Sequence, residues 1–208
     1  MLPQIERILK RSMGNGVALA ILAAGSSRRF GTQDKLAALL HKKMLGLHAA
    51  ETLANIAFAH RFVIASKSDH PCTNRWREMG YSIVTNGHAE FGQSTSVRLA
   101  AQTARGVGTR GLCICLADMP FVTGEHIHNL LKAFQQADHS QTIASASSGR
   151  PMPPAIFPAS QFHKLESLEG DQGARLLLKK ARHIHVNAPV LMDIDTPETL
   201  QELNQQTA

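Results

Sequence analysis

The chain has 208 residues, 43% of them hydrophobic and only 5% aromatic, which is enough for one domain with an aliphatic core. Its formal charge of +6 favours anionic partners, but the lysines and arginines are scattered and lack interleaved aromatic residues, which argues against nucleic acid. Three cysteines, the lack of any apolar run of about 18 residues and a charged N-terminus without an apolar leader predict a cytoplasmic protein with neither disulfides nor membrane contact.

The predicted elements alternate along the chain. Residues 1–16 form an expected helical extension, and residues 17–208 form a single domain. Within that domain the patterning predicts, in order, strand 17–24, helix 50–57, strand 61–66, helix 74–79, strand 81–85, helix 97–104, strand 112–117, helix 127–134 with Thr123 as N-cap, strands 142–145 and 155–157, helices 162–168 and 173–181, strands 183–186 and 190–194, and a last helix that begins after Thr196. Segment 149–158 contains four prolines and is expected to be irregular and to border a pocket.

Strands that alternate with helices predict an α/β fold, a three-layer α/β/α sandwich around a mostly parallel sheet. Ligands in such folds bind at the carboxyl ends of the strands. This rule brings the loop after the first strand, Asp118 and the acids at 193 and 195 to one rim of the sheet.

The loop from Gly25 to Lys35 combines small residues with cations. Small residues after a strand let backbone N–H groups approach phosphates closely, and Arg29 and Lys35 can neutralise phosphate charge. The loop matches neither the Walker A pattern nor G-x-G-x-x-G. A polyphosphate site and a plain surface loop with solvated cations therefore both stay open at this point.

Acidic residues follow two of the predicted strands. Asp118 comes directly after an apolar strand, and Asp193 and Asp195 flank Ile194. Carboxylates at strand ends suit Mg²⁺, which takes one or two carboxylates together with substrate oxygens. If Ile194 points into the core, both neighbouring acids face away from it. The alternatives are that Asp118 caps the helix near Glu125 and that Asp193 only closes a turn.

Other polar residues give less specific signals. Loop 86–97 leads from a strand into a helix, where it can contact a base or a phosphate. The histidine pairs at 126/128 and 183/185 are assigned structural or surface roles, because helical i, i+2 positions point apart and no third ligand lies near the second pair. Cys113 and Cys115 lie within an apolar strand and are expected to be inert buried thiols.

Five stretches taken together resemble the MobA-like nucleotidyltransferases of molybdenum cofactor biosynthesis, in the order of that family and across residues 17–203. They are Leu22-Ala23-Ala24-Gly25-Ser26-Ser27-Arg28-Arg29-Phe30-Gly31 with Lys35, residues 86–96, Asp118-Met119-Pro120, residues 170–175 and residues 193–198. The resemblance implies a Rossmann-like nucleotidyltransferase fold. It also implies Mg²⁺-dependent transfer of a nucleoside monophosphate to a phosphorylated acceptor, with release of pyrophosphate.

The same resemblance implies roles for individual residues. Catalytic roles fall to Arg29, Lys35 and Asp118, and Asp118 with Asp195 resemble the metal-binding pair for Mg²⁺, or for Mn²⁺ in its place. The implied nucleotide-binding positions are Leu22, Ala23, Ala24, Gly25, Ser26, Ser27, Arg29, Lys35, Asn86, Ser94 and Asp118. The implied acceptor-binding positions are Pro154, Asp171 and Gly173.

The form Ala23-Ala24-Gly25 resembles the cytidylyltransferase branch of the family, whereas the guanylyltransferase branch more often reads Leu-Ala-Gly-Gly. The cytidylyl form implies CTP as substrate and the molybdopterin cofactor as acceptor, with transient contact to molybdoenzymes or their chaperones. Guanylyl or other nucleotidyl transfer to a different acceptor, and a non-catalytic nucleotide-binding chaperone, remain as alternatives. One residue more than the family spacing separates Gly31 from Lys35, so the placement of this lysine is open as well.

Overall fold

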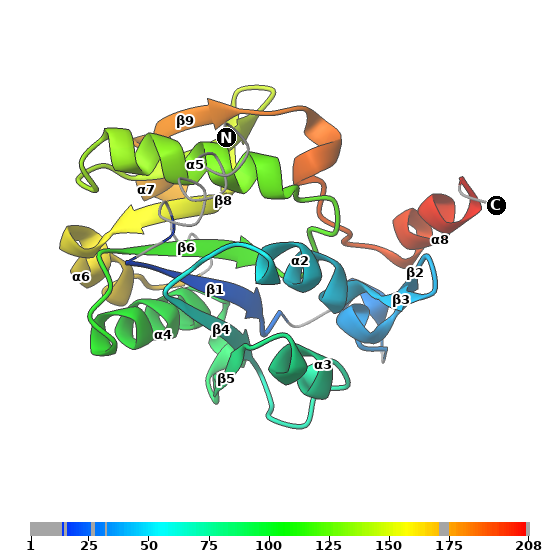
Figure 1. Ribbon diagram of the computed structural model, residues 1–208. Helices are drawn as coiled ribbons and strands as arrows, with labels where there is room; N and C mark the ends of the chain where they lie inside the picture. Colours follow the sequence, from blue (N-terminus) through cyan, green and yellow to red (C-terminus); the bar gives the residue numbers. More distant parts are fainter. Residues whose placement is uncertain (1–13, 15, 26–27, 32, 171–174, 207–208) are drawn as a thin grey trace, which may run out of the picture.

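The computed structural model describes residues 14, 16–25, 28–31, 33–170 and 175–206, and shows a sheet with helices on both faces (Figure 1). Residues 1–13 of the expected extension, Ser26, Ser27, Asp171 and Gly173 lie outside the described residues. The α-helices of the described residues are α2 (Leu45–Ala54), α3 (Thr73–Glu78), α4 (Gln93–Gly106), α5 (Gly124–Gln136), α6 (Phe162–Glu166), α7 (Arg175–Lys179) and α8 (Pro197–Gln205).

One seven-stranded sheet runs in the order β5-β4-β1-β6-β8-β7-β9. Its strands are β1 (Val17–Ala23), β4 (His60–Ala65), β5 (Ser82–Thr85), β6 (Gly111–Leu116), β7 (Ile143–Ser147), β8 (Arg150–Pro158) and β9 (Arg182–His185). All strand pairs are parallel except those that β8 makes with β6 and β7. The predicted three-layer fold around a mostly parallel sheet is confirmed, and β1 lies near its centre because all seven of its residues are apolar and buried.

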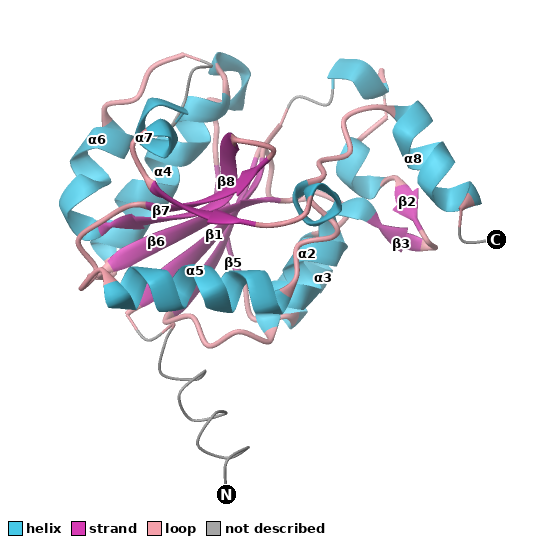
Figure 2. Ribbon diagram, turned by 90° about the horizontal axis from the view of Figure 1, so that it is seen from above, coloured by secondary structure: helices cyan, strands magenta, loops and turns pink. Residues whose placement is uncertain are grey.

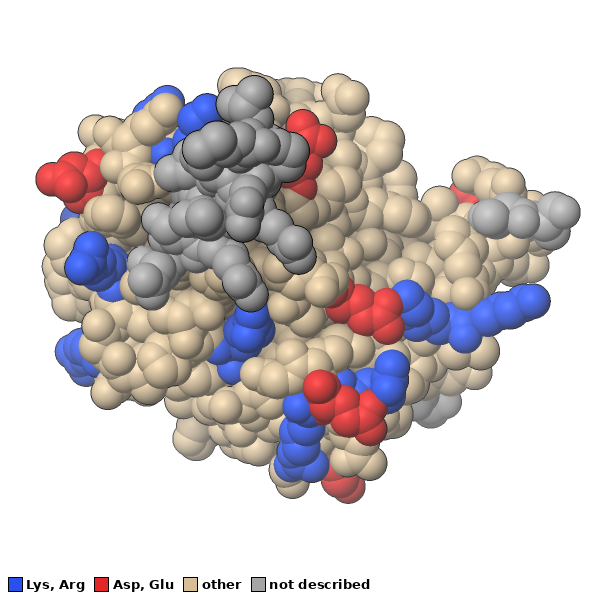
Figure 3. All heavy atoms as spheres, in the orientation of Figure 1, with Lys and Arg blue, Asp and Glu red and all other residues tan. Residues whose placement is uncertain are grey.

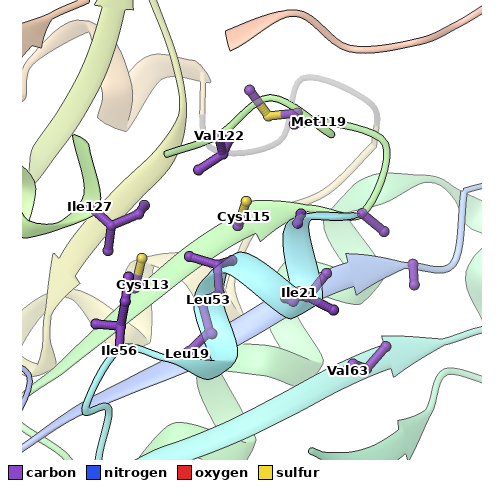
Figure 4. Close-up of a cluster of buried hydrophobic side chains, with 14 of the residues drawn as sticks. Leu19, Ile21, Leu53, Ile56, Val63, Cys113, Cys115, Met119, Val122 and Ile127 are labelled. Atoms are coloured by element: carbon purple, nitrogen blue, oxygen red, sulfur yellow. The ribbon is translucent and has the colours of Figure 1, made fainter. Parts of the chain in front are cut away.

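Alternate residues of β1 supply two separate cores. Leu19 and Ile21 face α2 and α5, where they meet Leu53 and Ile127 (Figure 4). The alanines between them face the alanine-rich side of α4, and these small side chains let the helix approach the sheet closely. Figure 2 shows the result, with α2 and α5 on one side of the sheet and α4 and α6 on the other.

The expectation of an irregular segment at residues 149–158 is wrong, because these residues form the nine-residue strand β8. Prolines are tolerated here since Pro153 and Pro154, joined by a cis peptide bond, fall where the pairing with β7 shifts between Ala144 and Ser145. The ladder is interrupted at that point and needs no N–H donor. The second half of the expectation holds, because β8 does line a cavity.

The predicted strand at 190–194 is also wrong. The chain forms a 3₁₀ turn at Ala188–Leu191, where Pro189 suits the first turn of a helix, and then runs extended. A small hairpin of β2 (Leu39–Leu40) and β3 (Lys43–Met44) was not predicted, since two residues per strand leave no readable period. The hairpin lies beside α8 (Figure 1), and the Asn204 side chain accepts from the N–H of His41 in its turn and donates to the carbonyl of Leu39 in β2.

The predicted helix caps are in place. The Thr123 hydroxyl accepts a hydrogen bond from the backbone N–H of His126 at 3.2 Å and caps α5, and Thr196 caps α8 through the N–H of Thr199. Within the described ranges, the chain has no helix with the length and apolar character that a membrane crossing requires. On the face shown in Figure 3, lysines and arginines lie in separate groups interspersed with acids.

Candidate active site

The carboxyl ends of β1 and β6 lie side by side at one rim of the sheet, and the arrowheads of both strands point to it in Figure 1. The N–H of Ala117 donates to the carbonyl of Leu22 at 3.0 Å, and Asp118 follows directly. The Asp118 carbonyl in turn accepts from the N–H of Ile194 at 3.0 Å. This bond brings the segment before α8 to the rim. Thr123, and not Asp118, caps α5, so the capping alternative for Asp118 is wrong.

Ile194 is fully buried, which meets the condition set for the acids beside it, and the adjacent Asp195 lies at the rim. Lys35 joins the two acids: its Nζ lies 2.5 Å from Asp118 Oδ2 and 3.1 Å from Asp195 Oδ1. Arg29 Nη1 lies 3.0 Å from Asp195 Oδ2. The structure thus gathers four predicted site residues into one ion-pair network, and the extra residue before Lys35 does not prevent the contact.

The Lys35 ammonium in this network is held in its ionised form. Burial by itself lowers the pKa of Lys35, but the adjacent carboxylates of Asp118 and Asp195 outweigh that effect and raise the pKa above its ordinary value. Lys35 is therefore a fixed cation at neutral pH. The charged form of Asp193, in contrast, is disfavoured, because burial and then the nearby charge of Asp195 raise the pKa of its carboxyl.

A cavity of about 460 Å³ opens beside this network. Its lining includes the loop after β1, the polar loop before α4, and Lys35 and Asp118 of the network. The described lining residues are Leu22, Ala23, Ala24, Gly25, Lys35, Leu36, Ala89, Glu90, Phe91, Gly92, Gln93, Ser96, Leu116, Asp118 and Gly170. Six of the predicted nucleotide-binding residues are among them, namely Leu22, Ala23, Ala24, Gly25, Lys35 and Asp118.

A second cavity of about 600 Å³ adjoins the first. The two share four lining residues, Leu22, Gln93, Leu116 and Asp118. Strand β8 and helix α7 supply much of the second cavity, with an apolar floor that includes Ile114 and Phe157 and with cations at Arg150, Arg175 and Lys179. Asp118 therefore stands where two cavities of different character meet.

Other predicted residues lie apart from these linings. Asn86 is buried and organises its loop: its amide donates to Thr95 and Ser96 and accepts from the N–H of His88. Ser94 is buried as well. The Pro154 carbonyl accepts from the Ser145 hydroxyl at 2.6 Å, and it is the neighbouring Pro153 that lines the second cavity.

Sequence reasoning missed several lining residues. Gln93 and Phe91 lie on the polar loop that was singled out, but neither was named as a contact, and the Phe91 side chain is 66% exposed at the mouth of the first cavity. Arg150 lies in segment 149–158, which was expected to border a pocket, and Lys179 follows Gly173 in the predicted helix 173–181, but neither side chain was named as a site residue. A cation on a proline-rich strand carries no local signal of a binding role.

The donor set suits a divalent cation held jointly with a ligand. Asp118 Oδ1 is buried and has no hydrogen-bond partner among the described residues. Asp118 and Asp195 supply two carboxylates, the number that Mg²⁺ uses when substrate oxygens complete its shell. The described residues contain no cluster of three or more His, Cys, Asp or Glu side chains, so a metal held by protein side chains alone is not indicated among them.

The histidines and cysteines have structural surroundings, as predicted. His126 Nε2 lies 2.7 Å from the Ser145 hydroxyl, and burial lowers the pKa of this imidazole. His128 contacts the Gly124 carbonyl one turn earlier on α5. Cys113 and Cys115 are buried free thiols, and burial raises the pKa of Cys115 to about 12, so neither is a reactive thiolate.

The sequence profile of the MobA-like NTP transferase domain matches residues 19–186, a span that runs from β1 to β9. The chain belongs to this family. Two MobA-like relatives cover much of its length. The purine catabolism protein PucB of Bacillus subtilis (strain 168) is 31% identical over 197 residues, with 85% of this chain and 90% of the relative covered. A protein of Pyrococcus horikoshii named as a probable molybdenum cofactor guanylyltransferase is 29% identical over 130 residues, with 62% of each chain covered.

The MobA-like fold is also seen in solved structures. A homologue of the Mycobacterium tuberculosis protein Rv0371c, from Mycobacterium sp. strain JC1, superposes with a TM-score of 0.71 at 21% identity. The superposition covers 92% of this chain and 98% of the other. At this level of identity the match shows a common fold.

Proposed function

We propose that this MobA-like protein transfers CMP from CTP to the phosphate of the molybdopterin cofactor and releases pyrophosphate, with Mg²⁺ as the required metal. The observation that carries the proposal is the junction of two cavities at Asp118, with Lys35, Asp195 and Arg29 beside it. A transfer reaction needs a donor site and an acceptor site that meet at the reacting atoms.

The first cavity suits the nucleotide. Lys35 and the exposed Gly25 line this cavity. Arg29 pairs with Asp195, which in turn contacts Lys35. A lysine acts on phosphate as a compact point charge, whereas an arginine offers forked contacts. Lys35 and Arg29 are therefore proposed to hold the triphosphate and the leaving pyrophosphate. Catalysis then consists of positioning and charge neutralisation, as in phosphoryl transfer generally.

The metal has a defined place in this proposal. Asp118 and Asp195 are proposed to hold Mg²⁺, and the unpartnered Oδ1 of Asp118 is the donor that is free to do so. A bound Mg²⁺ supplies neutralisation of the phosphate charge. Mn²⁺ takes the same oxygen ligands and is the expected substitute.

The second cavity suits an acceptor that has both a ring system to pack on apolar side chains and an anionic group. Its floor is built by aliphatic and aromatic side chains, and Arg150, Arg175 and Lys179 supply positive charge. These cations are proposed to attract the acceptor phosphate, whose oxygen attacks the α-phosphorus of the nucleotide directly. Asp193 also lines this cavity, where burial and then the nearby charge of Asp195 raise the pKa of its carboxyl.

The identity of the nucleotide base is the most specific part of the proposal. The sequence Ala23-Ala24-Gly25 favours CTP, whereas the relative named as a molybdenum cofactor guanylyltransferase makes GTP the second candidate. The decisive measurement is pyrophosphate release with each of CTP, GTP, ATP and UTP in the presence of Mg²⁺ and purified molybdopterin cofactor. Release with CTP supports the proposal, and release with GTP alone replaces the cytidylyl assignment by a guanylyl one.

A matched pair of variants tests the site. Asp118→Asn is expected to lower pyrophosphate release by about 100-fold or more, because it removes a carboxylate that is proposed to hold Mg²⁺ against the transferred phosphate. Asp138→Asn makes the same change at an exposed position after α5 and should behave as wild type. Undiminished turnover in a folded Asp118→Asn variant contradicts the assignment of Asp118.

A further inference from the structure

A buried histidine that belongs to neither cavity lining lies beneath the loop that carries Lys35. His70 precedes α3 and is only 4% exposed. Its Nδ1 accepts a hydrogen bond from the backbone N–H of Cys72 at 3.1 Å. Since the neutral ring has one acceptor and one donor nitrogen, this bond leaves the proton on Nε2. His70 Nε2 lies 2.9 Å from Asp34 Oδ2, a close contact between the ring and a carboxylate in which the angle at the N–H falls short of hydrogen-bond geometry.

Asp34 connects this histidine to Lys35. Its second carboxylate oxygen accepts from the N–H of Leu36 at 2.9 Å and so caps the 3₁₀ turn Lys35–Ala37. Its backbone carbonyl also accepts from the N–H groups of Ala37 and Ala38. The contact with His70 is the main cause of the lowered pKa of Asp34, which keeps this cap ionised. One side chain thus closes the turn on one side and meets His70 on the other.

The support beneath the turn is itself rigid. Trp76 stacks on His70 with ring centroids 5.0 Å apart and an angle of 19°, and its indole N–H donates to the Gly46 carbonyl. Cys72 Sγ lies 3.5 Å from the Leu36 carbonyl. The packing is close enough that a Cβ at Gly46 would lie 3.1 to 3.3 Å from Leu36, Cys72 and Trp76. The turn therefore rests on side chains that have no room to shift.

We propose that His70 is a positioning residue for Lys35: through Asp34 it fixes the 3₁₀ turn so that the Lys35 ammonium reaches Asp118 and Asp195. The inference rests on the proposed function, because it assigns Lys35 to the triphosphate. A 3₁₀ turn of three residues has few hydrogen bonds of its own, so its orientation depends on contacts from outside. His70 supplies such a contact from a buried place that solvent does not reach.

The test compares two substitutions of His70 in the full chain. His70→Leu removes the N–H, whereas His70→Gln carries an amide N–H at about the distance of Nε2. His70→Leu is expected to raise the KM for the nucleotide about tenfold and to weaken binding of inorganic tripolyphosphate equally, with kcat changed less than about threefold. His70→Gln should recover most of the loss. His128 is a half-buried histidine on α5, and the variant His128→Leu serves as the control for the loss of an imidazole.

A double-variant cycle decides whether the effect passes through the lysine. If His70 acts by placing Lys35, then His70→Leu has no further effect on tripolyphosphate binding in a Lys35→Met background. An equal effect in both backgrounds overturns the inference, and so does a His70→Leu variant with wild-type KM and tripolyphosphate affinity. If His70→Leu does not fold, Asp34→Asn applies the same test from the half-exposed side of the contact. Failure of the proposed function is a separate result: wild-type protein then releases no pyrophosphate, while tripolyphosphate binding still tests the role of His70.

Discussion

Replacing Lys35 with Met tests whether its ammonium and a divalent cation compete for the same two carboxylates. Lys35 Nζ lies 2.5 Å from Asp118 Oδ2 and 3.1 Å from Asp195 Oδ1, so one ammonium contacts both acids. Methionine keeps an unbranched apolar chain and lacks the charge. The substitution therefore leaves the two carboxylates open to a metal ion.

The expected gain follows from the repulsion that is removed. A unit charge and a divalent cation about 4 Å apart repel by about 2 kcal/mol in a water-like dielectric, and by more where water is excluded. The side chains of Lys35 and Asp118 are 11% and 17% exposed, but that of Asp195 is 46% exposed, so the water-like value is the appropriate one. It corresponds to about a 30-fold tighter binding of Mn²⁺ in the absence of nucleotide. The same variant should lose most of its pyrophosphate release, since the triphosphate loses its point charge.

The assay is a titration with Mn²⁺ alone, followed by the electron paramagnetic resonance signal of the free ion. Circular dichroism establishes that the variant is folded. Lys43→Met is the matched control, because the Lys43 ammonium pairs with Glu51 outside both cavities. A folded Lys35→Met variant that binds Mn²⁺ no more tightly than wild type would refute the competition and the shared use of Asp118 and Asp195.

Three further changes probe the scaffold. Asn86→Ala removes three hydrogen bonds from the loop before α4 and should lower the free energy of unfolding by about 1–3 kcal/mol; a wild-type urea midpoint would contradict this. Gly111→Ala would place a Cβ 2.7 Å from the Phe134 ring and should lower the free energy of unfolding by about 1–3 kcal/mol. An unchanged melting temperature would show that the ring moves aside and would contradict this prediction. Burial and then Asp195 raise the pKa of Asp193, so ionising it opposes folding once the pH exceeds its ordinary value of 3.8. Asp193→Asn should therefore be the more stable protein at pH 7 and as stable as wild type below pH 3.8. A difference in the free energy of unfolding that does not change with pH would exclude titration as the cause.

Local patterning was sufficient for most of the fold. β1 and β6 are readable as apolar runs because both faces of a central parallel strand are covered. α4 and α5 are readable because their buried residues recur at helical spacing. β8 was misread because its prolines signal a loop, and only the pairing shows that Pro153 and Pro154 fall at an interruption of the ladder.

The candidate site was predictable in part for a physical reason. Asp118 was placed at the rim correctly, because the carboxyl ends of parallel strands meet at one edge. Alternation around Ile194 placed Asp193 and Asp195 as candidates without choosing between them, and the resemblance to the family selected Asp195. Gln93, Arg150 and the other unexpected lining residues could not be inferred, since a cavity is formed by surfaces from several elements at once.

By itself, the sequence determined the alternation of strands and helices, the apolar centre of the sheet and the rim to which the acids belong. These features depend on periods of two and 3.6 residues, which are local properties of the chain. Only the tertiary structure decided the contacts of Lys35, whose partners Asp118 and Asp195 are 83 and 160 positions away. The same holds for His70 and Asp34, because a contact between distant segments depends on packing that no local pattern encodes.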